Sequence, residues 1–270
     1  MNRKALSVPY LFWSAAFILV PLCMVFYYGL TDKTGAFTLD NILAIASPEH
    51  SKALWEAVKL SLVSTVICFL LAYPLAMILS RMNVNKDSFL VLIFILPMWM
   101  NFLLRTMAWQ TLLEKTGVIN SILAFFKLPA LKIINTPGAI ILGMVYNFLP
   151  FMVLPIYNVL VKIDKNVINA ARDLGANELQ TFLKIIFPLS VPGIISGITM
   201  VFVPALTTFV ISNILGGSKI LLIGNVIEQE FTQTGNWHLG SGLSIVLMLF
   251  IIFNMVISAV TDKNGEGAVI

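Results

Sequence analysis

Side chains that could do covalent chemistry are few in this sequence, and they form no recognisable catalytic or metal-binding set. Only two histidines and two cysteines occur in 270 residues: His50, His238, Cys23 and Cys68. Their spacing matches no metal-ligand motif, and no G-x-x-x-x-G-K-[ST] segment is present to cradle phosphates. We therefore expect structural roles for these four residues, with no catalytic residue, no metal and no cofactor bound by the chain itself.

The composition indicates a membrane protein. Hydrophobic residues make up 59% of the chain and charged residues 11%, against about 25% charged residues in soluble domains. A spanning helix needs about 20 mostly apolar residues, whereas a spanning strand would alternate polar and apolar side chains. The apolar runs do not alternate, which predicts an all-α polytopic protein with about six transmembrane helices. Residues without Asp, Glu, Lys or Arg fill six segments: 5–31, 60–80, 88–104, 133–161, 185–218 and 231–261.

These runs divide the chain into three parts. Residues 1–54 are predicted to be an N-terminal span and an external loop, 55–261 the main transmembrane domain, and 262–270 a disordered tail. We expect the first run to be retained as a span, because it is long for a signal peptide and no A-x-A site follows it. The third run is expected to continue past Arg105, and Arg105 itself to reach the membrane surface or pair with a carboxylate.

The charge distribution predicts the orientation. With both termini inside, the internal segments hold nine Lys and Arg in 43 residues, and the external segments hold eight in 68. This bias places both termini and the segment 162–184 in the cytoplasm. Residues 110–126 are then predicted to be an external surface helix. The apolar stretch 219–227 is too short to span and is expected to dip into the membrane or cover a cavity. The basic residues form no patch with interleaved aromatics, so no nucleic-acid partner is expected.

A polar, mixed-charge loop at 162–188 separates the fourth and fifth apolar runs. Ala170 and Ala171 are predicted to lie on one side of a short helix that Gly175 ends in a left-handed conformation. The following helix carries Leu179, Phe182, Leu183 and Ile186 at the spacing of a single apolar stripe. We expect this second helix to lie along the membrane base, with Pro188 and Pro192 marking the start of the fifth span.

This loop resembles the EAA loop of ABC importer permeases, in which Glu-Ala-Ala is followed by a glycine and then by F-x-x-I-x-x-P. The matching residues are Ala170, Ala171, Gly175, Phe182, Ile185 and Pro188, with Ala176 beside the glycine. Asn169 stands where the family has glutamate. The resemblance implies that residues 162–188 are an ATPase-coupling loop.

A narrower resemblance covers about residues 55–260. The segments 96–109, 146–160 and 202–217 are similar to the spermidine/putrescine permeases of the PotB type. The resemblance implies a permease subunit in the cytoplasmic (inner) membrane of a prokaryote. It also implies two copies of a cytoplasmic ABC ATPase that carries ATP-Mg, a second and different permease chain, and an external polyamine-binding protein.

A polyamine would be recognised by carboxylates, carbonyl groups and aromatic faces. No charged residue other than Arg105 lies within a predicted span, and Glu228 and Glu230 near the outer face are the best carboxylate candidates. Prolines inside predicted spans would allow a bundle that changes shape: Pro97, Pro150, Pro155 and Pro204. The candidate transport pathway comprises Trp99, Tyr146, Asn147, Thr207, Thr208, Phe209, Ser212, Asn213, Glu228 and Glu230.

The sequence therefore predicts an ATP-driven importer permease that moves polyamines by alternating access. The same type of permease for another small solute, such as an organic cation, an amino acid or a ferric complex, remains open. A secondary transporter would ordinarily carry an acidic residue in mid-membrane, and a membrane enzyme would need a catalytic set. The sequence shows neither of these features.

Overall fold

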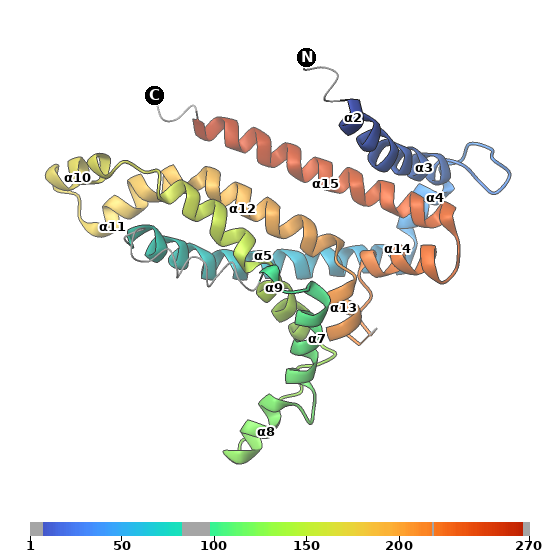
Figure 1. Ribbon diagram of the computed structural model, residues 1–270, viewed down its shortest axis with the longest axis horizontal. Coiled ribbons are helices and arrows are strands. Elements are labelled where there is room, and N and C mark those ends of the chain that lie inside the picture. The colour runs from blue at the N-terminus through green and yellow to red at the C-terminus, as the bar shows by residue number, and fades with distance from the viewer. Residues whose placement is uncertain (1–7, 83–97, 218, 267–270) are drawn as a thin grey trace.

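The computed structural model describes residues 8–82, 98–217 and 219–266, and these residues are almost entirely helical (Figure 1). Three long helices form the centre of the molecule: α5 (Pro48–Arg81), α9 (Pro137–Leu160) and α12 (Phe187–Thr207). Helix α15 (Trp237–Glu266) packs beside α12, and an N-terminal helix made of α2 (Val8–Ser14), η1 (Ala15–Leu19) and α3 (Val20–Gly29) packs beside α15. Each of these five rods is long and apolar enough to cross a membrane.

The all-α polytopic fold is thus as predicted. Five candidate spans lie among the described residues: 12–29, 48–81, 137–160, 178–207 and 237–258. The sixth predicted span, 88–104, falls mostly on residues 83–97, which lie outside the described part of the chain, as does Pro97.

Small residues allow α9 and α12 to approach closely. A Cβ atom added at Gly193 would lie 2.8 Å from the carbonyl oxygen of Pro155, and one added at Gly197 would lie 2.7 Å from Sδ of Met152. These glycines are four residues apart, so they form one small stripe on α12 against which α9 packs. The core therefore depends on the absence of side chains at two positions of α12.

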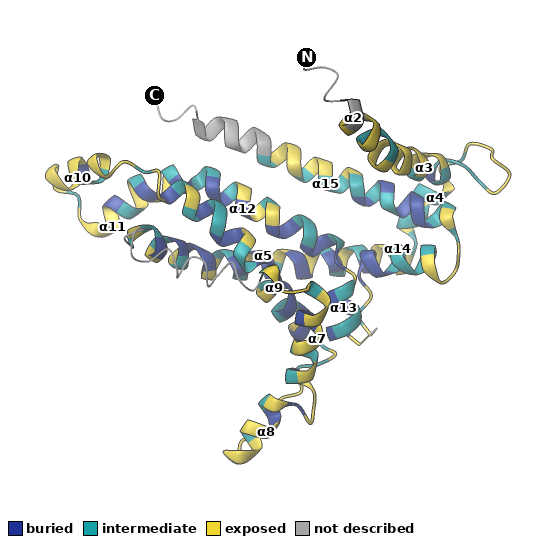
Figure 2. Ribbon diagram, in the orientation of Figure 1, coloured by how far each residue is buried: buried dark blue, intermediate teal, exposed yellow. Residues whose placement is uncertain are grey.

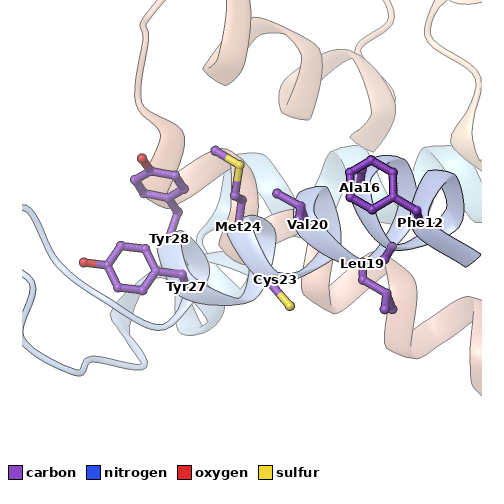
Figure 3. Close-up of a pocket in the computed structure, with 9 residues that line it drawn as sticks. Phe12, Ala16, Leu19, Val20, Cys23, Met24, Tyr27 and Tyr28 are labelled. Atoms are coloured by element: carbon purple, nitrogen blue, oxygen red, sulfur yellow. The ribbon is translucent and has the colours of Figure 1, made fainter.

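The N-terminal helix is attached mainly at its C-terminal end. Nδ1 of His238 donates to the Thr31 carbonyl oxygen (2.6 Å), and the ring of Tyr28 meets the edge of His238 at 5.3 Å. Most of the helix is exposed (Figure 2), and its outer face forms an open apolar groove of about 610 Å³ that runs from Phe12 to Tyr28 (Figure 3). His238 has the structural role predicted for it. His50 lies in the first turn of α5 rather than in a loop, and its Nδ1 donates to the Ala44 carbonyl oxygen (2.7 Å).

Two groups of short elements lie at opposite ends of the long axis (Figure 1). One end carries α4 (Asp40–Leu43), η2 (Ala44–Ala46) and α14 (Ile223–Thr232). The other end carries α10 (Lys165–Asp173) and α11 (Glu178–Thr181). The segment 162–184 and the segments 32–47 and 219–236 therefore lie at opposite ends of the bundle.

The boundaries of several predicted elements were wrong. Helix α5 begins at Pro48, before residue 55 where the main transmembrane domain was predicted to start, because the Ser47 side chain caps it and proline suits a first helical turn. The predicted surface helix 110–126 is two helices, α7 (Phe102–Leu113) and α8 (Val118–Phe125), separated by a turn that ends at Gly117. Helix α7 does not continue the third span, because the Asn101 side chain caps a new helix by accepting from the N–H groups of Leu103 and Leu104.

Two further predictions, both in the C-terminal third of the chain, differ from the structure. The predicted fifth span ends at Thr207, after which Thr208 is extended and α13 (Val210–Leu215) begins. The predicted disordered tail is wrong for residues 262–266, which extend α15. An existing helix adds residues without a new nucleation cost.

Candidate functional site

The loop between α9 and α12 has a defined local structure. The Asp164 side chain caps α10 by accepting from the Asn166 N–H (2.8 Å). Gly175 has a φ of +88°, and the N–H groups of Gly175 and Ala176 donate to the carbonyl oxygens of Arg172 (2.8 Å) and Ala171 (3.0 Å). This pair of bonds is a Schellman termination, so the glycine bend predicted from the sequence is confirmed.

The chain then enters α11 through a reciprocal cap. The Asn177 side chain accepts from the Gln180 N–H (2.8 Å), and the Gln180 side chain accepts from the Asn177 N–H (3.0 Å). Arg172 and Glu178 form an exposed ion pair across the bend (2.6 Å). These contacts fix the angle between α10 and α11 on both sides of Gly175.

The predicted separate helix along the membrane base is wrong. Helix α11, the π-helical turn η3 (Phe182–Ile186) and α12 form one uninterrupted helical segment from Glu178 to Thr207. Pro188 lies inside this rod, directly after the π-helical turn, and the helix continues past it although its missing N–H removes one intrahelical hydrogen bond. Only two of the four side chains in the predicted apolar stripe pack against the core. Phe182 and Ile186 pack inward, whereas Leu179 and Leu183 are exposed.

The loop is joined to the bundle through an aromatic cluster. The rings of Phe182 and Phe187 each lie 5.8 Å from the ring of Tyr73 on α5. The Tyr73 hydroxyl is 2.9 Å from the Ser190 hydroxyl on α12. These contacts therefore join η3 and the start of α12 to α5. Sequence reasoning missed Tyr73, which lies far from the loop motif in the chain, and also Ser190, which follows Pro188 by only two residues.

The exposed apolar face of α10 differs from the one predicted. Ala171 is buried against the chain itself, so it is not part of an outer surface together with Ala170. Val167, Ala170 and Leu174 are exposed instead, at i, i+3 and i+7, and Leu174 is 90% exposed. Helical spacing on either side of Ala170 could have identified this face. Asn169 and Gly175 are exposed, Ala176 and Ile185 are half-buried, and the Pro188 side chain is exposed.

A pocket of about 590 Å³ lies beneath this loop, where α10 faces the ends of α5 and α9. Arg81 and Lys165 line it together with apolar side chains such as Leu160 and Ile186. This polar-rimmed space separates part of α10 from the bundle.

The predicted pathway residues fall into separate groups. Ser212 and Asn213 on α13 converge on a residue the sequence did not single out, Asn225 of α14. The Asn225 side chain accepts from the Ser212 hydroxyl (2.6 Å) and donates to Asn213 Oδ1 (2.7 Å) and to the Phe209 carbonyl oxygen (3.1 Å). Thr208 is buried at the break beside them. These polar residues hold α13 against α14.

A second group surrounds Arg105. This side chain is 7% exposed, so the expectation that it reaches the membrane surface is wrong. Its guanidinium carbon lies 5.8 Å above the ring of Tyr146, which also meets the edge of Trp109 at 5.2 Å. Asn147 beside Tyr146 is buried and donates to the Gly143 carbonyl oxygen (2.8 Å). Trp99 is exposed and has no hydrogen bond or ring contact among the described residues.

A third group includes Thr207, Phe209 and Glu228, which line a common pocket, whereas Glu230 does not line it. Among the described residues, no three His, Cys, Asp or Glu side chains come together as a metal site.

Comparisons with known proteins agree with this architecture. Residues 72–263 match a family model described as the binding-protein-dependent transport system inner membrane component. The chain is 36% identical over 252 residues to the spermidine/putrescine transport system permease protein PotB of Haemophilus influenzae, covering 89% of this chain and 88% of that protein. It is 37% identical over 245 residues to the protein of the same name from Escherichia coli K12, covering 88% and 89%.

Solved structures show the same fold. A chain of a bacterial ABC transporter that imports the acidic polysaccharide alginate superposes with a TM-score of 0.79 at 17% identity, covering 95% of this chain and 94% of that one. A chain of the inward-facing MetNI methionine ABC transporter gives a TM-score of 0.58 at 15% identity, covering 82% and 99%.

Proposed function

This chain belongs to the inner membrane components of binding-protein-dependent transport systems, and we propose that its transported solute is a polyamine such as spermidine or putrescine. The family makes it a multi-pass inner membrane permease that works with an ATPase, a second permease and a binding protein. The proposed substrate rests on one observation. Over 88% of its length or more, the chain is similar to relatives named spermidine/putrescine permeases.

We propose the following assembly. Two copies of a cytoplasmic ABC ATPase bind and hydrolyse ATP-Mg, while this chain binds no nucleotide. The second permease is a different chain, and an external polyamine-binding protein delivers the solute. Both termini and the loop 162–184 lie in the cytoplasm, which agrees with the position of α10 at the opposite end of the bundle from α14.

We further propose that α10 is the coupling helix. Its exposed residues Val167, Ala170 and Leu174 offer an apolar face for a groove on the ATPase, and Leu174 is the central contact. Closure of the ATPases would displace α10, and the Phe182–Tyr73 contact would carry that movement to α5 and α12. Alternating access then follows from rocking of the central helices.

Reconstitution of the complete importer in liposomes tests the proposed solute. We expect the polyamine-loaded binding protein to stimulate ATP hydrolysis, and labelled spermidine and putrescine to accumulate inside the liposomes. Parallel assays with an organic cation, an amino acid and a ferric complex are the comparison. ATP-dependent uptake of one of these, with no uptake of either polyamine, would overturn the proposed substrate while leaving the family unchanged.

A further inference from the structure

A pocket of about 520 Å³ lies where α14 packs against α15 and the end of α12. Gly224 makes this packing possible, because a Cβ atom there would lie 2.6 Å from the Thr207 carbonyl oxygen. Helices α14 and α15 contribute equally to the lining, and α15 supplies apolar side chains that include Leu247, Met248 and Ile251. Helix α14, which supplies part of the lining, lies at the end of the bundle opposite α10, and the proposed orientation makes this the outer end (Figure 1).

One carboxylate faces this apolar space. Glu228 is the only charged side chain among the described residues that line the pocket. Its Oε1 accepts from the Thr232 hydroxyl (3.0 Å), and the side chains of Thr207 and Ser244 are also part of the lining. A cation that enters the pocket would be attracted by the Glu228 carboxylate, and the apolar lining beside it lowers the local dielectric and strengthens that attraction.

Two aromatic side chains, Phe209 and Phe231, complete the lining. Aromatic rings attract organic ammonium groups, and aliphatic side chains accommodate the methylene chains between them. We propose that this pocket is a binding site for one ammonium end of an alkyl polyamine, with Glu228 as its counter-charge. The inference rests on the proposed function and adds a location and a recognition residue to it.

The chain provides a matched control for Glu228. Glu230 lies on the same helix, is half-buried to a similar degree, and accepts from the hydroxyl of Thr234 four residues later (2.8 Å), as Glu228 does from Thr232. Glu230 does not line the pocket. Neutralising either residue removes the same charge from α14. A difference in spermidine uptake between the two variants therefore reflects the pocket rather than the net charge.

The first test compares Glu228→Gln and Glu230→Gln in the reconstituted importer. We expect Glu228→Gln to lower spermidine uptake about tenfold, the effect of losing one charge-assisted hydrogen bond. Glu230→Gln should stay within about twofold of the parent chain, and Glu228→Asp should recover part of the loss. ATPase retention and ATP hydrolysis without binding protein should be unchanged in all three. Equal uptake by the two Gln variants would overturn the inference.

A second test uses the unmodified chain, so it does not depend on how a variant folds. An apolar carbodiimide should modify Glu228, and spermidine should protect Glu228 but not Glu230, as measured by peptide mass spectrometry. Protection by a lipid in place of spermidine, or no protection, would overturn the site. If the unmodified importer transports no polyamine, the proposed function fails instead. The two failures are therefore distinguishable.

Discussion

At the scale of single residues, Asn225 and Gly175 determine the local structure at the two ends of the bundle. Asn225 satisfies four polar groups, because its side chain also accepts from the Leu222 N–H (3.0 Å). Gly175 sets the direction of the coupling loop. No atom lies within 4 Å of a Cβ added there, so only its positive φ restricts the residue type.

Asn225→Ala should destabilise the outer part of the protein. It removes the partner of the Leu222 N–H and of Asn213 Oδ1, while the Ser212 hydroxyl keeps the Phe209 carbonyl oxygen as an acceptor. We expect a loss of about 2–4 kcal/mol, since each buried polar group left unsatisfied costs about 1–3 kcal/mol. Thermal unfolding of the purified importer would measure this loss. Gln233→Ala, at an exposed position just after α14, should leave the unfolding midpoint unchanged. Equal midpoints for both variants would contradict the role of Asn225.

Gly175→Val should weaken coupling between ATP hydrolysis and transport. A side chain at φ +88° costs about 1–2 kcal/mol, and a β-branched one costs most. Gly235 is a matched control, because its φ is +65° and a Cβ there also meets nothing within 4 Å. We expect Gly235→Val to keep its transport per ATP hydrolysed and Gly175→Val to lose it. Similar losses in both variants would point to general strain rather than to the loop.

At the scale of elements, the helices act as rods whose contacts decide what moves together. Helices α11, η3 and α12 are continuous, and α12 is held to α9 through Gly193 and Gly197. Helix α10 is therefore joined to the core by this stiff segment on one side and by residues 161–164 after α9 on the other.

Leu174→Asp should release the ATPase. Leu174 is 90% exposed on α10, so the substitution leaves the chain's own packing intact and places a charge in the proposed apolar contact. Co-purification of the ATPase should fall at least tenfold, while the permease remains in the membrane. Leu128→Asp, at an exposed position after α8, is the control and should retain the ATPase. Full retention by Leu174→Asp would show that α10 docks elsewhere.

Gly193→Ala should destabilise the α9–α12 contact by about 1–3 kcal/mol, because the new methyl group meets a backbone carbonyl that has no alternative position. Gly197→Ala should cost less, since its nearest neighbour is the flexible Met152 thioether. Gly138→Ala, whose nearest neighbour would be 3.5 Å away, should be neutral. Thermal unfolding of the three variants should give this order, and a reversed order would contradict the proposed packing.

At the scale of the whole molecule, the two ends of the bundle have different tasks. In the proposed function, one end would present α10 to the ATPase, and the other would present α14 and its pocket to the incoming solute. The weakly packed N-terminal helix leaves an apolar face uncovered along its outer side (Figure 3), a surface suited to lipid.

Cysteine labelling should confirm which end is outside. In a chain with Cys23 and Cys68 replaced, Lys115→Cys should react with an impermeant maleimide in intact spheroplasts, and Asn169→Cys should react only after the membrane is opened. Both positions are exposed and neither side chain makes a hydrogen bond in the structure, so labelling reports on sidedness. The opposite pattern would invert the topology.

The sequence alone determined the membrane class, most of the spans and the glycine bend in the loop 162–188. Uncharged runs of sufficient length must become helices, because backbone groups in lipid are satisfied only within the segment. The glycine bend could also be predicted from the local sequence, because a Schellman termination depends only on neighbouring residues and on a residue that tolerates positive φ.

Only the tertiary structure decided which residues act together. Burial of Ala171 and exposure of Leu174 depend on how α10 meets the bundle, and the choice of Glu228 over Glu230 depends on the rotation of α14 against α15. The convergence of Ser212 and Asn213 on Asn225 joins residues from separate helices. Helical periodicity determines which side chains share a face of a helix. The direction in which that face points depends on packing between distant parts of the chain, which no local sequence pattern specifies.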